Sequence, residues 1–459
     1  MQLSELLITV NRNLLKKLFL FFVFISFVLL ADGCKKNPTE PEKPISSVPP
    51  SLELSVDGVS CTEAWINVKK LNDTTFLPIS VKINDKEFFH GFLAAMDTVL
   101  FVDSLAPSTT YTVKGIVLDT VKEITITTLP TTSHNFTWQT FTFGERTSTF
   151  YDVAIIDENN IWAVGEIYMN DSLGNPDPNA YNAVHWNGSK WEIKKISVLY
   201  KDNLTFAPLE SVFALPTGEI IFSSGLPYLP QADGWKLYHL WDMGVLTQND
   251  GRVTNIWGTS MNDLYFVGSK GTIVHYDGKN WKKIESETQT DLTDVYGDGD
   301  NVFICGYKDF KPTVLLKYNN GIMTKLIEED HFEYKTDFIS GWIKSIWVKK
   351  DKLFSLTFYD LYRSKTSTKG EGVAIWKGDI NSWGSNAVRG NDVNDIFTTG
   401  YNGLLWHFNG VGWKKYDELG ETTNHYRCIS VTDKLIVIAG FKYLNGIDRY
   451  GLLTIGKWK

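Results

Sequence analysis

The sequence has little cysteine, no excess of positive charge and, in its larger part, no helical spacing of apolar side chains. Of 459 residues only 4 are cysteine. Cys61, Cys305 and Cys428 show none of the short spacings of a metal cluster or a disulfide framework, so we expect buried free thiols. The net charge is −8, without a basic stripe, so nucleic acid is not an expected partner. The missing helical period favours an all-β fold.

The familiar motifs of enzymes are missing as well. No Gly-x-Ser-x-Gly elbow, Walker-type phosphate loop or paired-acid pattern stands out. The segment Asp298-Gly-Asp300 lacks the remaining ligands of a calcium loop. We therefore assign no catalytic residue, no metal site and no cofactor from the sequence. An enzyme would need acids from distant segments to meet, and that alternative stays open.

The first residues resemble a targeting signal. Basic residues precede a thirteen-residue apolar segment, Leu18 to Leu30, which is shorter than the roughly 20 residues of a membrane-spanning helix. It ends at Ala31-Asp-Gly-Cys34, which resembles the lipobox of bacterial lipoproteins. The resemblance implies a signal peptide over 1–33, a lipidated Cys34 and membrane attachment through this anchor. A retained, uncleaved anchor is the alternative. Residues 34–50, rich in proline and charge, predict an extended tether.

A repeat occupies the larger part of the chain. The unit from Ile256 to Trp281 recurs in degraded copies, each with apolar strands, a glycine after the second strand and an Asn-Gly or Asp-Gly turn. The copies start near Tyr151, Glu210, Thr254, Thr293, Lys344, Asn386 and Arg427, with spacings of 59, 44, 39, 51, 42 and 41 residues. Such spacing predicts a β-propeller over 135–459, with seven blades expected and six or eight as alternatives. The strand from His134 to Phe143 is expected to complete the last blade.

A separate unit of short alternating strands is predicted over 51–130. Its segment Leu105-Ala-Pro-Ser-Thr-Thr-Tyr111 resembles a signature of the fibronectin type III domain, a resemblance that covers some 80 residues. In that family the tyrosine hydroxyl bonds back to the backbone, and a tryptophan fills the sandwich core. The resemblance implies these roles for Tyr111 and Trp65. Such a module spaces or presents its neighbour, and we assign it no chemistry.

Three histidines share one register of the repeat. His185, His275 and His407 each stand in the predicted third strand of their copy. Equivalent positions of a ring lie apart, so a common metal ion is not expected. We interpret these histidines as packing residues of the repeat.

Two classes of loop are long and variable, those after the second strand of a copy and those between copies. In a propeller both classes open on the same face, where function commonly lies. Flat rings from these loops would stack on a glycan or a protein while polar groups fix its orientation. The predicted ligand-binding residues are Tyr168, Tyr228, Trp235, Tyr307, Tyr359, Arg363, Tyr401, Tyr443 and Arg449. In the alternative interpretation the tyrosines wedge adjacent blades together.

These features predict a monomeric, lipid-anchored binding or interaction protein of the bacterial cell envelope, periplasmic or on the outer-membrane surface. Its propeller resembles those of secreted bacterial lipoproteins, and its partner would be a polysaccharide or an envelope protein. The alternative function is a carbohydrate-active hydrolase or lyase on the same face. Clustered acids of raised pKa at the channel mouth would favour the enzyme. Exposed rings without such acids would favour the binding protein.

Overall fold

The computed structural model describes residues 51–71, 78–93, 95–177, 181–308, 311–329, 339–358, 360–366, 373–374, 384–444 and 446–459. Almost all regular structure in these ranges is strand, besides two short 3-10 helices, η1 (Ser269–Gly271) and η2 (Asp417–Leu419). Neither of these helices has the length or the apolar character to cross a membrane. The predicted signal peptide over 1–33, Cys34 and the tether over 34–50 lie outside the described residues.

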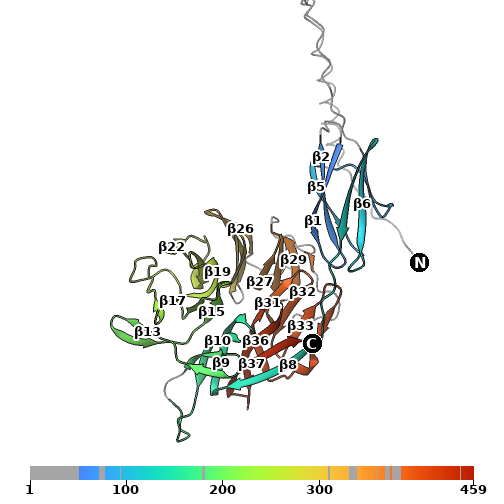
Figure 1. Cartoon of the computed structure of the whole chain (residues 1–459). Coiled ribbons are helices and arrows are strands. Elements are labelled where there is room, and N and C mark those ends of the chain that lie inside the picture. The colour runs from blue at the N-terminus through green and yellow to red at the C-terminus, as the bar shows by residue number, and fades with distance from the viewer. Residues whose placement is uncertain are drawn as a thin grey trace, which may run out of the picture.

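The N-terminal unit is a sandwich of two antiparallel sheets, separate from the larger ring of sheets (Figure 1). One sheet has the order β1 (Ser51–Val59), β2 (Ala64–Leu71) and β5 (Asp97–Val102). The other has the order β4 (Lys86–Gly91), β3 (Ile79–Ile83), β6 (Thr110–Val117) and β7 (Thr120–Thr127). Alternate residues of β2, among them Ile66 and Val68, are fully buried between the sheets. The predicted period of two therefore builds this core.

Trp65 does not fill the sandwich core. It stands between Ala64 and Ile66, which face the core, so the alternation of the strand turns its ring to the opposite side. There it lies against the ring of sheets, 8% exposed, with Lys352 Nζ 4.3 Å and the Arg363 guanidinium 5.0 Å from its ring centre. The core role that the family resemblance implied for Trp65 is wrong. Its ring instead joins the two units through cation–π contacts.

Five four-stranded antiparallel sheets follow one another in the middle of the chain, each with its strands in sequence order. The first two are β15 (Ser211–Ala214), β16 (Ile220–Ser223), β17 (Pro227–Gln231), β18 (Gly234–Leu237), and β19 (Val253–Ser260), β20 (Asp263–Gly268), β21 (Ile273–Tyr276), β22 (Trp281–Ile284). The third is β23 (Leu292–Asp298), β24 (Asn301–Lys308), β25 (Lys311–Asn319), β26 (Ile322–Glu329). The last two are β27 (Ile343–Lys349), β28 (Lys352–Thr357), β29 (Leu361–Lys365), β30 (Val373–Ala374), and β31 (Ser385–Asp392), β32 (Asp395–Gly400), β33 (Leu405–Phe408), β34 (Trp413–Lys415). Each sheet is named below by its first strand.

The two ends of the repeat region share one eight-stranded sheet. One half is β9 (Glu145–Asp157), β10 (Asn160–Tyr168), β11 (Tyr181–Trp186) and β12 (Trp191–Lys194). The other half is β35 (Asn424–Val431), β36 (Leu435–Tyr443), β37 (Arg449–Trp458) and β8 (Phe136–Phe143). A single parallel pair, Arg449 with Thr147, joins the halves. All of β8 pairs with β37, so the predicted completion of the last repeat by the strand before the first one is confirmed.

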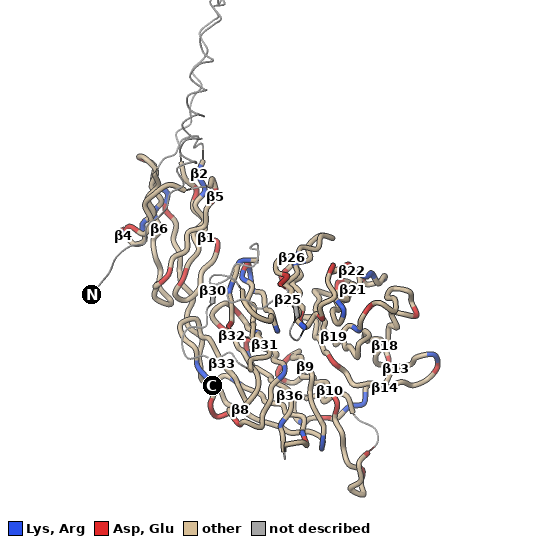
Figure 2. The backbone as a smooth tube through the Cα atoms, turned by 180° about the vertical axis from the view of Figure 1, so that it is seen from behind, with Lys and Arg blue, Asp and Glu red and all other residues tan. Residues whose placement is uncertain are grey.

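The first strands form a closed circle. Along the chain β9, β15, β19, β23, β27, β31 and β35 each contact the next, and β35 contacts β9. The remaining strands of each sheet run outward, and a hairpin of β13 (Ser197–Tyr200) and β14 (Asn203–Phe206) projects between the β9 and β15 sheets. Lys and Arg are interspersed with Asp and Glu along the described chain (Figure 2). The arrangement is propeller-like.

The tight turns of the repeat lie on one face of the ring. Gly188 and Gly278 lie in four-residue connections between third and fourth strands and have φ of 89° and 90°, which glycine adopts without strain. Asn187 and Asp277 do not share this positive φ, so the predicted Asn-Gly and Asp-Gly pairs are not the central residues of two-residue turns. Antiparallel order places these turns on the same side as the turns between first and second strands. We call this side the short-turn face. The opposite side, with the loops after second strands and between sheets, is the long-loop face.

The sandwich docks on the β27 and β31 sheets at their short-turn side. Glu63 pairs with both Nη atoms of Arg363 at 2.5 and 3.0 Å, and Asp57 pairs with Lys365 at 3.0 Å. Cys61 Sγ lies 3.9 Å from the carbonyl oxygen of Asn409, in the turn between β33 and β34. Arg363 is therefore bound between the two units, in the middle of β29, and not in a long loop as the sequence predicted.

The three described cysteines are free thiols. Cys61 and Cys305 are buried, as expected, whereas Cys428 is only partly buried. They belong to the sandwich, the β23 sheet and the β35 half-sheet. None of these thiols therefore links two parts of the fold covalently.

Candidate ligand-binding site

The first strands surround a cavity of about 770 Å³ at the centre of the ring. All the repeat starts predicted from the sequence line it, and we call them the cavity ring: Tyr151, Glu210, Thr254, Thr293, Lys344, Asn386 and Arg427. Five of them stand at or just before the beginning of a first strand, whereas Tyr151 and Arg427 lie within β9 and β35. Because the repeat puts the same position of every copy at the same depth, these residues form one layer. The predicted phase of the repeat is confirmed.

The cavity lies toward the long-loop face. Its outer lining includes Glu166, at the end of a second strand, and Ser224 and Ser269, just after second strands. Arg252 and Asp291, which directly precede first strands, complete this part of the wall. The long loops expected to carry function therefore surround the hollow.

Asp152, one residue after the start of its copy, joins two neighbouring sheets. Its Oδ2 accepts hydrogen bonds from Ser211 Oγ at 2.8 Å and from the Val212 N–H at 3.0 Å. Burial raises the pKa of Asp152 to about 6, although these hydrogen bonds act in the opposite direction. The carboxyl therefore changes its charge close to neutral pH.

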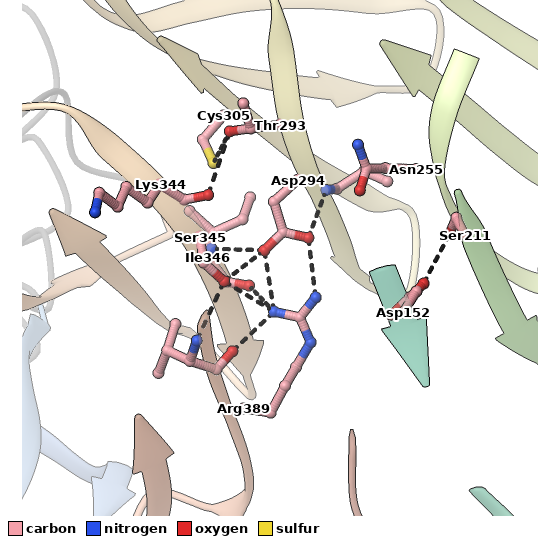
Figure 3. A network of polar contacts seen from close by, with 12 residues as sticks. Asp152, Ser211, Asn255, Thr293, Asp294, Cys305, Lys344, Ser345, Ile346 and Arg389 are labelled. Carbon is pink, nitrogen blue, oxygen red and sulfur yellow. Dashed lines mark hydrogen bonds and ion pairs between the residues drawn. The ribbon is translucent and has the colours of Figure 1, made fainter. Parts of the chain in front are cut away.

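Asp294 makes the same link between the β23 and β27 sheets (Figure 3). Its Oδ2 accepts from Ser345 Oγ at 2.6 Å and from the Ile346 N–H at 3.0 Å. Here the carboxylate also receives both Nη atoms of Arg389, at 2.9 and 3.0 Å. Burial alone would lower the pKa of Arg389, but the charge and hydrogen bonds of Asp294 outweigh it and raise that pKa. The pair is a fixed, neutral part of the cavity wall.

The cavity wall carries five carboxylates: Asp152, Glu166, Glu210, Asp291 and Asp294. Burial raises the pKa of Asp152, whereas Asp294 pairs with Arg389 and Glu210 pairs with Arg252. Glu166 accepts a hydrogen bond from the Tyr168 hydroxyl, and Asp291 accepts one from the Lys270 N–H. Hydrolysis of a glycoside commonly uses two carboxylates, one of them free to act as nucleophile or base. The carboxylates therefore do not decide between a binding protein and an enzyme.

Two cations of the cavity ring have a different environment. Lys344 Nζ donates to the carbonyl oxygen of Ser385 at 3.0 Å and lies 5.2 Å from the centre of the Phe358 ring. Burial lowers the pKa of Lys344. The exposed guanidinium of Arg427 lies 5.2 Å from the centre of the Tyr151 ring.

Two of the predicted ligand-binding residues are packing residues. Tyr228 is 1% exposed, and its hydroxyl accepts a hydrogen bond from Ser224 Oγ at 3.0 Å. Trp235 donates from Nε1 to the carbonyl oxygen of Ile220 at 2.9 Å and packs on Trp162. Both rings lie in the core between the β9 and β15 sheets. For Tyr228 and Trp235 the alternative interpretation, a wedge between blades, is the correct one.

Tyr168 and Tyr307, two further predicted residues, lie in different sheets. Tyr168 is partly buried, and its hydroxyl donates to Glu166 Oε2 at 3.4 Å, beside the cavity. Tyr307 stacks on Trp342 with 6.1 Å between ring centres. Tyr359 lies outside the described residues. Of Tyr168 and Tyr307, it is Tyr168 that is placed next to the cavity wall.

Tyr401, Tyr443 and Arg449 come together in a cluster on the long-loop face. Tyr401 is 45% exposed, and its ring contacts His425 at 5.2 Å, as does Tyr443 at 5.0 Å. Phe441 stacks on His425 and carries the Arg449 guanidinium 5.0 Å above its ring. The sequence analysis missed His425 and Phe441, which are the centre of the cluster. Both lie within strands of the repeat, where they resemble ordinary packing residues.

The three register-equivalent histidines lie in three different sheets. His185 contacts Asn160 Oδ1 at 2.9 Å, His275 contacts Asp263 Oδ1 at 2.9 Å and His407 contacts Asp395 Oδ1 at 2.8 Å. Each also stacks on an aromatic ring of its own second strand, Trp162, Tyr265 or Phe397. The packing interpretation is confirmed for these residues. In the described part of the chain no three or more His, Cys, Asp or Glu are grouped to hold a metal ion.

Comparisons with known proteins agree with this architecture. No protein-family model matches the chain, and no curated protein matches it by sequence. A solved structure of YCF48 bound to D1 peptide does superimpose, with a TM-score of 0.50 over 70% of this chain and 95% of that one. The chain has a propeller-like fold. At 14% identity the likeness indicates the fold alone.

Two further solved structures match over a similar part of the chain. YCF48 from Cyanidioschyzon merolae has a TM-score of 0.48 and 13% identity, over 70% of this chain and 98% of that one. The computationally designed Ika8 protein has a TM-score of 0.42 and 12% identity, over 68% of this chain and 98% of that one.

Proposed function

We propose that this chain is a binding protein of the cell envelope that holds a segment of another polypeptide at the long-loop mouth of its central cavity. The observation that carries the proposal is the convergence of the cavity ring, which brings one residue from each repeat start into one polar hollow. Polar groups of both signs in a preformed hollow suit recognition. The structure of YCF48 bound to D1 peptide supports the idea, because it holds a peptide on a similar fold.

The long-loop face favours a polypeptide over a polysaccharide as the ligand. Aliphatic side chains at its loop tips are strongly exposed, with Leu173 at 84% and Ile447 at 82%. The β13–β14 hairpin adds the cross-strand pair Leu199 and Leu204, 70% and 73% exposed. Such side chains bury well against apolar side chains of a protein, whereas sugar rings stack on aromatic faces. Tyr401 supplies a single exposed ring in the same region.

The proposed architecture has two parts, a seven-bladed propeller and a fibronectin type III-like sandwich. The closed circle of first strands supports the blade number. The Tyr111 hydroxyl, which accepts a hydrogen bond from the Ala106 N–H at 2.7 Å, supports the sandwich family, because that family uses such a tyrosine corner. The sandwich order of three and four strands is also that of the family.

The proposed anchor is a lipid on Cys34, with residues 34–50 as the tether. Its support is the sequence resemblance alone. In the described part, Ser51 begins β1, and the residues that dock on the ring, Asp57 and Glu63, lie at the other end of that strand. Nine residues of strand span roughly 30 Å. The sandwich would then act as a spacer that leaves the long-loop face free.

The full chain, purified in detergent, tests this function on a peptide array and a glycan array. We expect peptides to bind to the parent protein. The variant Thr254→Trp places an indole in the cavity, so its affinity for these peptides should be at least tenfold lower. The matched control is Lys190→Ala with Lys279→Ala, two exposed cations in turns of the short-turn face, which should bind as the parent does. Binding of glycans alone, or equal peptide binding by Thr254→Trp, would contradict the proposal. The affinities of variants are compared only where their melting temperatures equal that of the parent, so that a loss of binding is not a loss of folding.

A further inference from the structure

The cations of the cavity fall into two groups, which differ in whether an acid accompanies them. Both Nη atoms of Arg389 donate to the carboxylate of Asp294, and Arg252 forms an ion pair with Glu210. Within the described residues, no ion pair joins Lys344 or Arg427 to a carboxylate. The first group is therefore neutralised by the fold, whereas the second leaves its charge available to the cavity.

The two available cations occupy the same position of their repeats. Lys344 lies at the register shift between β27 and β28, and Arg427 lies at the register shift between β35 and β36; both belong to the cavity ring. Between them, on β31, stands Asn386, whose Nδ2 donates to the carbonyl oxygen of Tyr426 at 2.8 Å. This bond fixes the amide and leaves a second N–H for another acceptor. Since β27, β31 and β35 are consecutive in the circle of first strands, the three residues form one arc of the cavity wall.

The surroundings of Lys344 point to a missing anion. Its ammonium is partly buried, and its contacts are one carbonyl oxygen and the face of Phe358. A buried cation is costly unless an anion pairs with it. The carboxylates of the wall are used elsewhere or lie beyond ion-pair distance: Asp152 is engaged by Ser211 and Val212, and in the described part of the chain no ion pair joins Glu166 or Asp291 to Lys344. An anionic group that enters from the long-loop face would complete the arc.

We propose that Lys344, Asn386 and Arg427 form an anion subsite of the cavity that binds a carboxylate of the polypeptide ligand, from an acidic side chain or a free C-terminus. This inference rests on the proposed function and adds the chemistry of one anchoring group. Arg427 would approach the carboxylate with its planar fork and Lys344 with a point charge, while the Asn386 amide N–H donates a neutral hydrogen bond. The apolar tips of the long loops would hold the flanking residues of the same segment.

The test selects peptides on the full chain in detergent from two random dodecapeptide libraries, one with free C-termini and one with the peptides inside a carrier protein. Enriched acidic side chains in the second library indicate a side-chain carboxylate. Enrichment confined to the first library, and lost when synthetic peptides are amidated, indicates the C-terminus. Either result supports the subsite when Lys344→Gln with Arg427→Gln weakens the best peptide at least tenfold. The control Lys190→Gln with Lys279→Gln should bind as the parent does.

A double-mutant cycle separates charge recognition from a structural role. Neutralising the peptide carboxylate should cost the parent at least tenfold in affinity and the Lys344→Gln, Arg427→Gln variant much less. The melting temperature of Lys344→Gln should stay the same or rise, because a partly buried unpaired charge is removed. Peptides bound without any preference for a carboxylate would overturn the subsite and leave the proposed function standing. Enrichment of no peptide would overturn both, and binding of acidic glycans alone would assign the arc to a different class of ligand.

Discussion

The β31 and β27 sheets use the same two positions for opposite purposes. In the β31 sheet, Asp395 begins the second strand and contacts His407 of the third, and both are buried. In the β27 sheet the same positions hold Lys352 and Arg363, as the pairing of Phe354 with Arg363 and of Phe397 with His407 demonstrates. Two cations in one sheet cannot satisfy each other. Lys352 pairs with the adjacent Asp351 at 2.6 Å and also contacts the face of Trp65. Arg363 reaches out of the repeat to Trp65 and to Glu63.

The difference teaches how a repeat acquires a docking surface. The β9 and β19 sheets keep an internal polar pair like that of the β31 sheet, which satisfies each blade within itself. Changing the charge of such a pair, without changing its place, leaves donors on the blade surface that a second domain can satisfy. The sandwich supplies the Glu63 carboxylate to Arg363 and the Trp65 ring to both cations, whereas Lys352 takes its carboxylate from Asp351.

The internal polar pair should contribute most to the free energy of unfolding in the sheet where it is most buried, which is the β31 sheet. In His407→Ala, Asp395 would lose its partner in the core, so we expect a loss of roughly 3 kcal/mol in unfolding free energy. Melting followed by tryptophan fluorescence measures the change. The control His185→Ala, in the more exposed pair of the β9 sheet, should cost clearly less. Equal losses would mean that burial does not decide the strength of the pair.

The external pair should control docking and not folding. In Arg363→Glu the ion pair with Glu63 becomes a repulsion, so we expect the sandwich to detach while the ring melts at nearly the parent temperature. Small-angle scattering would report a longer molecule. The exchange of charges, Glu63→Arg with Arg363→Glu, should restore the compact form. A longer molecule in the exchanged variant as well would show that the charges do not hold the units together.

The β27 and β31 sheets can be compared most directly by giving the β27 sheet the Asp–His pair of the β31 sheet. Lys352→Asp with Arg363→His installs the internal pair in the β27 sheet. We expect the ring to melt within about 1 kcal/mol of the parent, the scale of one hydrogen bond, and the sandwich to be released. Proteolysis in the connection after Thr127 should become faster. A collapse of the ring would contradict the equivalence of the two sheets.

The smallest effect is expected from pH. His134 Nδ1 lies 2.8 Å from His407 Nδ1, and burial, followed by the nearby His407 and Lys414, lowers the pKa of His134 to about 4. Between pH 6.5 and 4 the unfolded chain then binds the proton more readily than the folded one, so stability should be full above pH 6.5 and fall below it. His134→Gln should flatten this slope in melting experiments. Asp152, whose pKa is raised, acts in the opposite sense and is present in both proteins.

The repeat made the register predictable, but neither the cavity nor the contacts between distant segments. Lys344 and Arg427 were predicted as starts of the repeat, without a role at the cavity that they line. Alternation alone cannot tell what covers the outer face of a strand. For this reason Trp65 was assigned to the wrong side, since its partners Lys352 and Arg363 lie in a sheet far along the chain.

Aromatic residues were the other source of error. Tyr228 and Tyr401 both follow a second strand, yet Tyr228 is buried against the preceding β9 sheet and Tyr401 is exposed beside His425. Loop composition does not distinguish these outcomes, because both depend on the neighbouring sheet. The Asp294–Arg389 pair was missed for the same reason, since its members belong to sheets that are not adjacent in the ring.

The pairing of β8 with β37 sets the order of events during synthesis. The strand that β8 needs, β37, ends at Trp458 and is synthesised long after β8, because all the other strands of the ring lie between them in the sequence. Until then the edge at Phe136 to Phe143 has no partner and the circle of first strands is open. Contacts of this sequence separation form slowly, because a long loop must be closed first. The final folding step is therefore a late, all-or-none closure, and truncations near the C-terminus should act on the whole ring at once.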